Sequence, residues 1–154
     1  DPDNPIYKAR YVAKGYSQVY GTDYFETFSP TARMESVRIL IQLVVNNDLL
    51  LHQMDVKSAY LHAPIECDIY VNQPQGYEKF DSNNVKLVWK LKKSLYGLKQ
   101  SGRNWHNLLN TFLLDLDFIQ SDADSCVYVN NCEDGLVIIL VWVDDIIIVV
   151  NSNY

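Results

Sequence analysis

Two adjacent carboxylates, Asp144 and Asp145, interrupt the most apolar stretch of this 154-residue sequence, residues 136–150. The stretch is rich in β-branched residues, which favours two buried strands joined by a tight turn at 143–146. Two carboxylates at the tip of a buried hairpin repel each other, and a bound divalent cation is the usual compensation. Hard carboxylate oxygens favour Mg²⁺ or Mn²⁺ over softer metals. The chemistry first indicated is therefore that of a carboxylate metal site.

A third carboxylate is expected from another strand, because one pair of acids holds two metal ions poorly. Asp55 ends an apolar segment, residues 49–55, which is predicted to be a strand, and it precedes Asp144 by 89 positions. Two ions about 4 Å apart can activate an attacking hydroxyl and stabilise a leaving pyrophosphate. An Asp-Asp pair by itself is more often a polar turn, so the pair alone does not decide the function.

The apolar stretch 136–150 does not predict a membrane helix. It has 15 residues with two acids at its centre, whereas a membrane helix needs about 20 apolar residues and central charge is costly. The polar first residues predict no signal peptide, and both ends resemble cuts in a longer protein. Cys67, Cys126 and Cys132 are odd in number and contain no Cys-x-x-Cys pair, so they are interpreted as reduced thiols of an intracellular protein.

The net charge of −6 is divided unevenly along the chain. Residues 1–103 hold all 13 Lys and Arg against 11 acids, whereas residues 104–154 hold eight acids and no Lys or Arg. Within the first part, residues 86–103 carry six basic residues and no acid. A strip of that density is suited to follow a phosphate backbone. It is equally typical of a solvated surface, so both interpretations stay open.

The elements that must position these residues follow from apolar spacing. Helical spacing predicts helices over residues 34–47 and 101–116 and a short helix over 57–62. Alternating or continuous apolar runs predict strands over residues 6–13, 49–55, 69–71, 85–91, 125–129 and 136–143. Together these elements predict a single α+β domain over residues 1–154, with helices packed on one face of a largely antiparallel sheet.

Four groups of residues carry a more specific pattern. They are residues 8–18 (KARYVAKGYSQ) with 24–30 (YFETFSP), 53–61 (QMDVKSAYL), 91–100 (LKKSLYGLKQ) with 103–105 (RNW), and 143–145 (VDD). In this order and at nearly this spacing, they resemble the reverse transcriptases of copia-type (Ty1/copia) LTR retrotransposons. The resemblance covers the chain from about residue 7 to residue 150. One departure is Trp142, where the family usually has tyrosine.

The resemblance implies the fingers and palm of a right-hand polymerase, taken from a longer Pol polyprotein and lacking the thumb. It implies an RNA-directed DNA polymerase that transfers nucleotides from dNTPs to a primer 3′-hydroxyl, with two Mg²⁺ ions as cofactor and Mn²⁺ as a possible replacement. Asp55 and Asp144 match the family's principal metal ligands, and Asp145 matches the neighbouring carboxylate. The carbonyl of Val56 would be a further ligand.

A set of substrate-binding residues is also implied by the resemblance. Backbone N–H groups of Ser58 and Ala59 would hold the incoming triphosphate, and Tyr60 would block a ribose 2′-hydroxyl. The residues that would reach the triphosphate or line the nucleotide and template pocket are Arg10, Lys8, Tyr96, Gly97 and Gln100. Tyr60 and Tyr96 are also compatible with ordinary core positions.

The partners that the resemblance implies are an RNA or DNA template, a primer, dNTPs and the other polyprotein regions (thumb, RNase H and integrase), with no membrane. The implied location is intracellular, in a cytoplasmic virus-like particle or in the nucleus. The alternative is an inactive retrotransposon remnant that folds and at most binds nucleic acid through residues 86–103. A palm-like nucleotide cyclase is disfavoured, because the sequence has no Gly-Gly-Asp/Glu-Glu-Phe-like motif.

Overall fold

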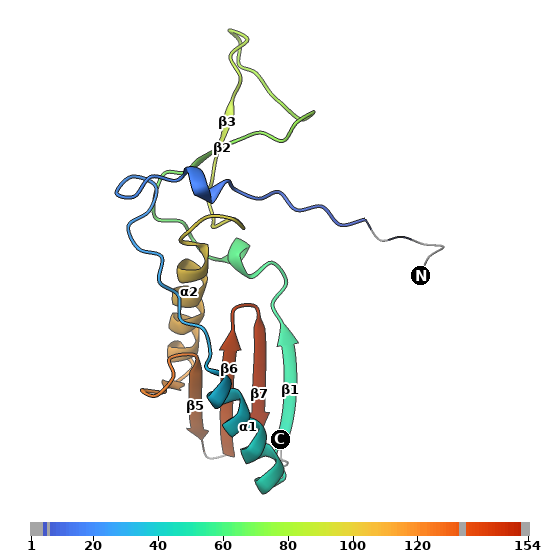
Figure 1. The fold of residues 1–154 in the computed structure, drawn as a ribbon, viewed down its shortest axis with the longest axis vertical. Coiled ribbons are helices and arrows are strands. Elements are labelled where there is room, and N and C mark those ends of the chain that lie inside the picture. The colour runs from blue at the N-terminus through green and yellow to red at the C-terminus, as the bar shows by residue number, and fades with distance from the viewer. Residues whose placement is uncertain (1–4, 6, 133–134, 152–154) are drawn as a thin grey trace.

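The computed structural model describes residue 5, residues 7–132 and residues 135–151 (Figure 1). The helical elements are η1 (Gly15–Ser17), α1 (Met34–Asn47), η2 (Ala59–His62) and α2 (Ser101–Asp115), where η denotes a 3₁₀ helix. The strands are β1 (Leu50–Asp55), β2 (Tyr70–Asn72), β3 (Val88–Lys90), β4 (Ile119–Gln120), β5 (Val127–Cys132), β6 (Gly135–Trp142) and β7 (Asp145–Val150). The predicted helices over 34–47 and 101–116 are confirmed.

A five-stranded antiparallel sheet forms the centre of the molecule, in the order β1-β7-β6-β5-β4. The apolar stretch 136–150 forms the β6–β7 hairpin, as predicted. The predicted strand that ends on Asp55 is β1, which lies at the edge of the sheet beside β7. A strand of the hairpin and the strand carrying the third acid are therefore direct neighbours.

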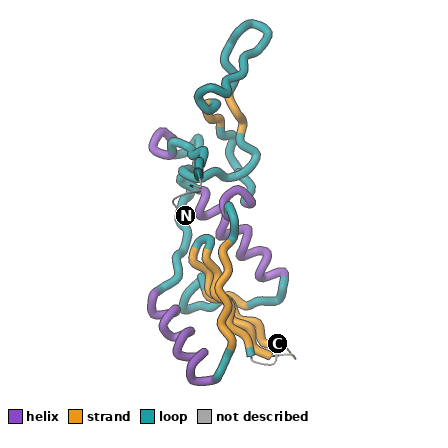
Figure 2. The backbone as a smooth tube through the Cα atoms, turned by 90° about the vertical axis from the view of Figure 1, so that its right-hand side faces the viewer, coloured by secondary structure: helices purple, strands orange, loops and turns teal. Residues whose placement is uncertain are grey.

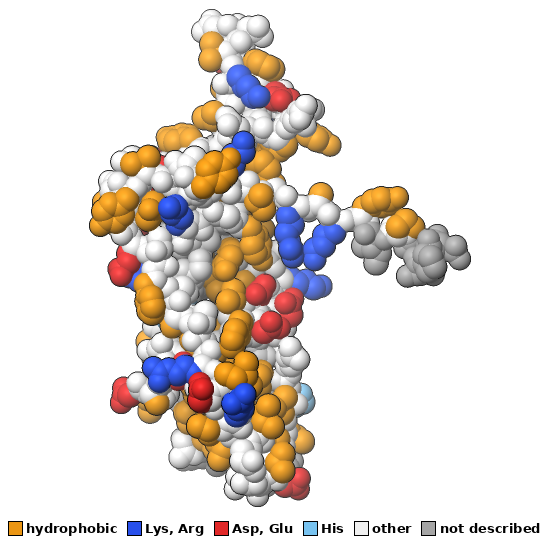
Figure 3. Space-filling model, in the orientation of Figure 1, with side chains coloured by type: hydrophobic (Ala, Val, Ile, Leu, Met, Phe, Trp, Pro, Cys, Tyr) orange, Lys and Arg blue, Asp and Glu red, His pale blue; other side chains and the backbone are white. Residues whose placement is uncertain are grey.

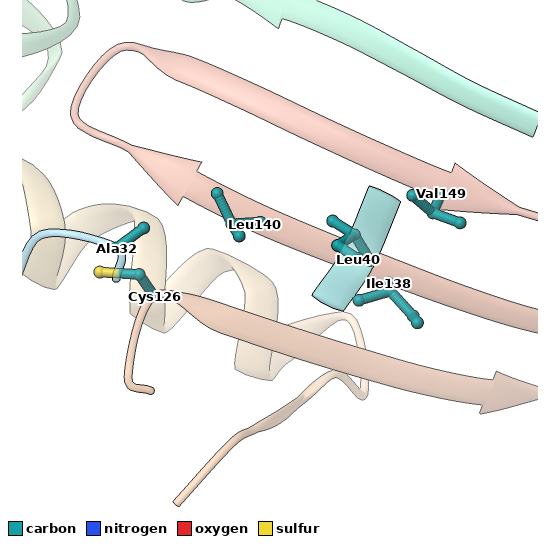
Figure 4. Packing of buried hydrophobic residues seen from close by; sticks show 6 residues of the cluster. All are labelled: Ala32, Leu40, Cys126, Ile138, Leu140 and Val149. Atoms are coloured by element: carbon teal, nitrogen blue, oxygen red, sulfur yellow. The ribbon is translucent and has the colours of Figure 1, made fainter. Parts of the chain in front are cut away.

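Helix α1 covers one face of this sheet. It ends at its predicted position because Asp48 adopts the left-handed backbone region, with a φ of 52°. The buried residue of α1 is Leu40, which inserts into an apolar cluster on the sheet (Figure 4). The other buried members of this cluster are Ala32, Cys126, Ile138, Leu140 and Val149.

Helix α2 covers the opposite face. Its Leu113 is buried and packs with Tyr128, Ile139 and Val141 of the sheet. In Figure 2 the five-stranded sheet runs between the two helices, with α1 on one side and α2 on the other. Successive residues of β6 thus alternate between two separate apolar clusters.

The prediction that the helices pack on one face of the sheet is therefore wrong. The central strand β6 is apolar on both faces, since Ile138 and Leu140 face α1 while Ile139 and Val141 face α2. A strand of this kind needs cover on both sides, because an open face would leave its apolar side chains in water. The unbroken apolar run in the sequence is the signal of this two-sided burial.

The start of α1 is capped from a distant part of the chain. The carboxylate of Asp124 accepts hydrogen bonds from the Arg33 N–H at 2.9 Å and from the Ser36 hydroxyl at 2.6 Å. Asp124 is itself buried. Because the first N–H groups of a helix have no partner inside it, a buried acceptor at this point stabilises the helix and ties it to β5.

Residues 7–13 do not form the predicted strand, and Ile6 lies outside the described residues. This segment pairs with no strand in the part of the chain that the structure describes, and it extends away from the body (Figure 1). Its inner end is tied down where the Ala13 N–H donates to the Tyr96 carbonyl at 2.8 Å. Alternating apolar residues form a strand only where a neighbouring strand supplies hydrogen-bond partners.

Two other predicted strands have different bounds from those expected. The strand predicted over 85–91 is reduced to β3, which pairs with β2 in a two-stranded ribbon. Its predicted apolar face is exposed at Val85, Leu87 and Trp89, and a ribbon of only two strands buries little apolar surface by itself. The strand predicted over 125–129 is β5, which begins at residue 127 and extends to 132. Residues 133 and 134, which follow it, lie outside the described residues.

No helix in the described part of the chain is long and apolar enough to cross a membrane. Cys67 and Cys126 are free thiols, and the side chain of Cys132 lies outside the described residues. Burial, followed by the charge of Asp124, raises the pKa of the Cys126 thiol to about 11. This thiol is therefore uncharged at neutral pH and serves as a small apolar core residue.

Candidate active site

The strand register places the three predicted acids at one end of the sheet. Asp55 is paired directly with Asp145 across β1 and β7, and Asp144 lies in the turn that precedes β7. The Val56 N–H donates to the Asp144 carbonyl at 2.8 Å, which joins the end of β1 to this turn. Residues separated by 89 positions in the sequence are thus held at one end of the sheet.

The turn itself has an unusual backbone. Trp142 pairs with Asp145, so that Val143 and Asp144 form a two-residue hairpin loop. Val143 has a φ of 58°, a region that a β-branched side chain adopts only at an energetic cost. Backbone strain of this kind persists only where surrounding contacts enforce it, and it is found preferentially at functional sites.

The three carboxylates differ in their surroundings. Asp144 is half-buried, whereas Asp55 and Asp145 are exposed. The Asp145 carboxylate accepts a long hydrogen bond from the Gln53 amide, at 3.4 Å. Among the described residues, neither the Asp55 nor the Asp144 carboxylate has a hydrogen-bond or ion-pair partner. No group of three or more His, Cys, Asp or Glu side chains in this part of the chain is arranged to hold a metal ion. The donors present are hard oxygens, which fit Mg²⁺ or Mn²⁺.

An aromatic pair lies next to Asp144. The ring centroids of Tyr60 and Tyr96 are 4.8 Å apart, and the rings are tilted by 46°. Burial, then the negative charge of Asp144, then Tyr96, raise the pKa of the Tyr60 hydroxyl. The Arg10 guanidinium carbon lies 5.5 Å from the centre of the Tyr96 ring. Arg10, Tyr96 and Tyr60 are therefore successive neighbours, and Tyr60 is near enough to Asp144 to feel its charge.

Close backbone contact fixes the segment that carries Arg10. Gly97 has a φ of 92°, and a Cβ built at this position would lie 2.2 Å from the Ala13 carbonyl oxygen. A Cβ at Gly15 would lie 2.0 Å from the Gly97 carbonyl oxygen. Both positions require glycine, because any side chain would push the two segments apart. Gly97 thus places the N-terminal segment beside Tyr96.

The remaining predicted substrate residues are arranged as follows. Ser58, with a left-handed φ of 58°, precedes the short 3₁₀ helix η2, and Ala59 is fully buried. Lys8 is exposed on the extended segment. Gln100 is buried, and its amide group accepts a hydrogen bond from the Gln18 amide and donates one to the Asp23 carbonyl. The Gln100 amide therefore links α2 to residues 18–23.

A separate cavity of about 500 Å³ lies between the N-terminal segment and β2. Its lining includes Tyr11, Val71 and Gln73, and none of the three aspartates contributes to it. This hollow is therefore distinct from the place where the carboxylates meet.

Comparison with known proteins assigns the chain to a family. The family described as reverse transcriptase (RNA-dependent DNA polymerase) matches residues 3–154, which is nearly the whole chain. The chain belongs to the reverse transcriptase family. No solved structure shows a significant match.

Relatives of this reverse transcriptase domain are polyproteins of copia-type and Ty1-type transposons. It is 42% identical over 144 residues to the Retrovirus-related Pol polyprotein from transposon TNT 1-94 of Nicotiana tabacum, and these residues are 93% of the chain and 11% of the relative. It is 42% identical over 146 residues to the RE1 Pol polyprotein of Arabidopsis thaliana, covering 95% and 10% of the two chains. The Ty1-NL2 Gag-Pol polyprotein of Saccharomyces cerevisiae is 36% identical over 143 residues, or 92% and 8%. The chain thus spans about a tenth of the length of these relatives.

In the basic strip of the reverse transcriptase domain, residues 86–103, three of the six cations form ion pairs. Its paired cations are Lys86 with Glu78 at 3.4 Å, Lys90 with Asp68 at 2.6 Å and Arg103 with Glu26 at 2.8 Å. Lys99 lies over the Tyr24 ring, 5.0 Å from its centre. Lys92 and Lys93 are exposed and make no ion pair with any described residue. These two lysines are the strip's best candidates for contact with phosphate.

The structure has a second basic surface, which the sequence did not predict. Figure 3 shows Lys and Arg side chains gathered where the N-terminal segment leaves the body, directly beside a group of acidic side chains. A positive surface next to carboxylates is suited to a triphosphate whose charge is shared with metal ions. The sequence placed Lys8 and Arg10 near the triphosphate only through the family resemblance.

Two contacts at the site could not be predicted from the sequence. Gln53 approaches the Asp145 carboxylate, and the buried Trp105 indole donates to the Val143 carbonyl. Both residues stand inside the matched motifs, at 53–61 and 103–105, but nothing in their spacing indicates a partner. Each depends on a strand or helix register that only the folded chain defines.

Proposed function

We propose that residues 1–154 form the catalytic core of an RNA-directed DNA polymerase of a copia-type retrotransposon. It transfers a nucleotide from a dNTP to a primer 3′-hydroxyl on an RNA or DNA template. The observation that carries the proposal is the pairing of Asp55 with Asp145, with Asp144 in the adjoining turn. Membership of the reverse transcriptase family supports it.

The proposed metal ligands are Asp55, Asp144, Asp145 and the carbonyl of Val56, holding two Mg²⁺ ions, with Mn²⁺ as a substitute. When bound, the ions supply activation of the 3′-hydroxyl and stabilisation of the leaving pyrophosphate. Asp55 and Asp144 lie at the same end of the sheet, and their carboxylates have no hydrogen-bond or ion-pair partner among the described residues. This supports the assignment, because carboxylate oxygens without protein partners are free to bind a hard cation. Asp145, which also bonds Gln53, has the less direct role.

The incoming nucleotide is proposed to lie between the carboxylates and the aromatic pair. Arg10 and Lys8 attract the triphosphate by charge, and the N–H groups of Ser58 and Ala59 donate to it. Tyr60 borders Asp144 and occupies the space next to the sugar, so that it excludes a 2′-hydroxyl. Tyr96 supports the Tyr60 ring, and Gly97 and Gln100 hold the adjoining backbone in place.

In this proposal, residues 1–154 are one unit that contains the fingers and palm. Its partners are the primer–template, dNTPs and the thumb, RNase H and integrase regions of a Pol polyprotein. The relatives' names are consistent with such a context, since each is a Pol or Gag-Pol polyprotein. An intracellular location, in a cytoplasmic virus-like particle or in the nucleus, follows from the same context.

The experiment is extension of a DNA primer on an RNA template by a Pol chain that contains these residues. The proposal expects incorporation of dNTPs with Mg²⁺ or Mn²⁺ and none after chelation, with restoration when the metal is returned. A DNA template of the same sequence shows whether both template classes are used. A folded chain that binds the primer–template but incorporates nothing with either metal would instead be the inactive remnant.

A further inference from the structure

A buried tryptophan reaches the turn that carries Asp144. Trp105 of α2 is only 7% exposed, and its indole Nε1–H donates to the Val143 carbonyl at 2.6 Å. The two residues are 38 positions apart, so the bond joins α2 to the tip of the β6–β7 hairpin. A short bond to a buried donor restricts where the carbonyl can lie.

Both carbonyls of the two-residue turn are held, and by different elements. The Val143 carbonyl accepts from Trp105, and the Asp144 carbonyl accepts from the Val56 N–H at 2.8 Å. Val56 directly follows Asp55 in the chain. The turn is therefore fixed on one side by the strand that carries the first aspartate and on the other side by α2.

The strained backbone at Val143 makes this support necessary. With a φ of 58°, the residue relaxes to another conformation unless its surroundings prevent it. Packing supplies only part of that restraint, because a cavity of about 140 Å³ adjoins the bond and is lined by Trp105, Val143 and Tyr60. Packing around the Val143 side chain is therefore incomplete, and the directional hydrogen bond contributes to holding the turn.

The tryptophan ring is itself firmly placed. It packs in a cluster with Ala59 and Ala63, both fully buried, and with Val56 and Tyr60 at the edge of the same cluster. A donor that is held by packing transmits its position to its acceptor. Trp105 thus lies in one cluster with Val56 and Tyr60 and donates its hydrogen bond to Val143. Val56 follows Asp55 in the chain, and Val143 precedes Asp144.

We propose that Trp105 is a positioning residue for the reaction: its indole N–H holds the Val143 carbonyl and thereby sets the place of the Asp144 carboxylate. This inference rests on the proposed function, because it takes Asp144 to be a metal ligand. Trp105 contacts neither the nucleotide nor the metal ions in this scheme. Its effect is on the rate of the chemical step and not on the affinity for substrates.

The decisive variant removes the N–H donor of the Trp105 indole and keeps a ring of nearly the same shape. Replacement of Trp105 by benzothienylalanine puts sulfur in place of the indole N–H with nearly the same shape, and Trp105→Phe is a second variant without the donor. We expect single-nucleotide incorporation under single-turnover conditions to slow by about tenfold or more per active molecule. The dissociation constants for dNTP and for primer–template should stay within about twofold of the parent values, because no substrate contact is lost.

The matched control is the same replacement at Trp89. That side chain is 42% exposed on β3, packs edge-on against Tyr11 and forms no indole hydrogen bond within the described residues. Its replacement should leave the incorporation rate unchanged. Titration of active sites separates positioning from folding, because a merely structural role lowers the active fraction and the melting temperature but not the rate per active molecule.

The experiment distinguishes failure of the positioning role from failure of the proposed function. If the parent incorporates nucleotides and the benzothienylalanine variant at position 105 does so at the same rate per active molecule, the positioning role is refuted and the proposed function stands. If the folded parent incorporates nothing, the proposed function fails, and the inference fails with it. If the hydrogen bond persists in solution, the Trp105 indole N–H should exchange with solvent more slowly than that of Trp89. Equally fast exchange at the two indoles would also refute the positioning role of Trp105.

Discussion

Asp55 lies directly opposite Asp145 in the antiparallel pair of β1 and β7. Side chains at paired positions project from the same face of a sheet, so the two carboxylates share a face. A slip of one residue would turn Asp55 to the other face and separate it from Asp145. The register of an exposed edge strand therefore determines whether the candidate site exists at all.

Tyr60 is expected to select against ribonucleotides. Because its ring adjoins Asp144 and is supported by Tyr96, truncation to Ala or Val opens space beside the proposed sugar position. The ratio of kcat/KM for a deoxynucleotide to that for its ribonucleotide should fall by roughly tenfold or more in Tyr60→Ala or Tyr60→Val. Tyr60→Phe keeps the ring and should keep the ratio. An unchanged ratio in the alanine variant would make Tyr60 an ordinary packing residue.

Asp124 is expected to make the stability of the fold depend on pH. Burial alone raises the pKa of its carboxyl, but hydrogen bonds from Ser36, Arg33 and Cys126 and the charge of Arg33 hold it below its ordinary value of 3.8. A folded-state pKa below the unfolded one stabilises the protein above about pH 4, and this contribution is lost as the pH falls through the folded-state value. Asp124→Asn should therefore lower the free energy of unfolding at pH 7 by about 1–3 kcal/mol.

The measurement is denaturant unfolding of the parent and of Asp124→Asn between pH 7 and pH 3. The difference between the two should shrink toward the acid end, where the parent also loses its charge. Asp122→Asn is the matched control, since Asp122 is an exposed acid two positions away. It should change the free energy of unfolding by less than about 0.5 kcal/mol. A pH-independent difference at position 124 would argue against the charged cap.

Gly97→Ala is expected to detach the N-terminal segment. The added Cβ would meet the Ala13 carbonyl oxygen at 2.2 Å, so the bond from the Ala13 N–H to the Tyr96 carbonyl must break. Gly76→Ala is the matched control, because Gly76 has a similar φ of 85° and no atom within 4 Å of its Cβ position. Gly76→Ala should cost about 1 kcal/mol of backbone strain, and Gly97→Ala clearly more. Cleavage of residues 7–13 by a protease should accelerate in Gly97→Ala only, and equal rates would refute the close contact.

The sequence was most informative where structure is local. The spacing of apolar residues correctly predicted α1, α2 and β1, and the β-branched run around Asp144 correctly predicted a hairpin with carboxylates at its tip. These features depend on residues within one turn or one strand of each other. The motif pattern then indicated the family, which the comparisons confirm.

The features that could not be predicted all depend on long-range pairing. Asp124 bonds the Arg33 N–H at the start of α1, 91 positions earlier, and the indole of Trp105 bonds a carbonyl 38 positions later. The sequence expected to form a strand over 6–13 has the right alternation, but its described residues 7–13 pair with no strand in the described part of the chain. The prediction of a single covered face was wrong for a different reason: β6 is apolar on both faces, and its continuous apolar run indicates cover on both sides.

The most direct test of the proposed active site is the loss of a single carboxylate charge. Asp55→Asn and Asp144→Asn, each made in a Pol chain that contains these residues, keep the size of the side chain and remove a metal ligand. The incorporation rate should fall by about 1,000-fold or more, equal to at least about 4 kcal/mol of transition-state stabilisation. Asp48→Asn, at the exposed C-terminal end of α1, is the control and should extend the primer at the parental rate. Near-parental extension by either Asp55→Asn or Asp144→Asn would contradict the assignment of these carboxylates to the reaction.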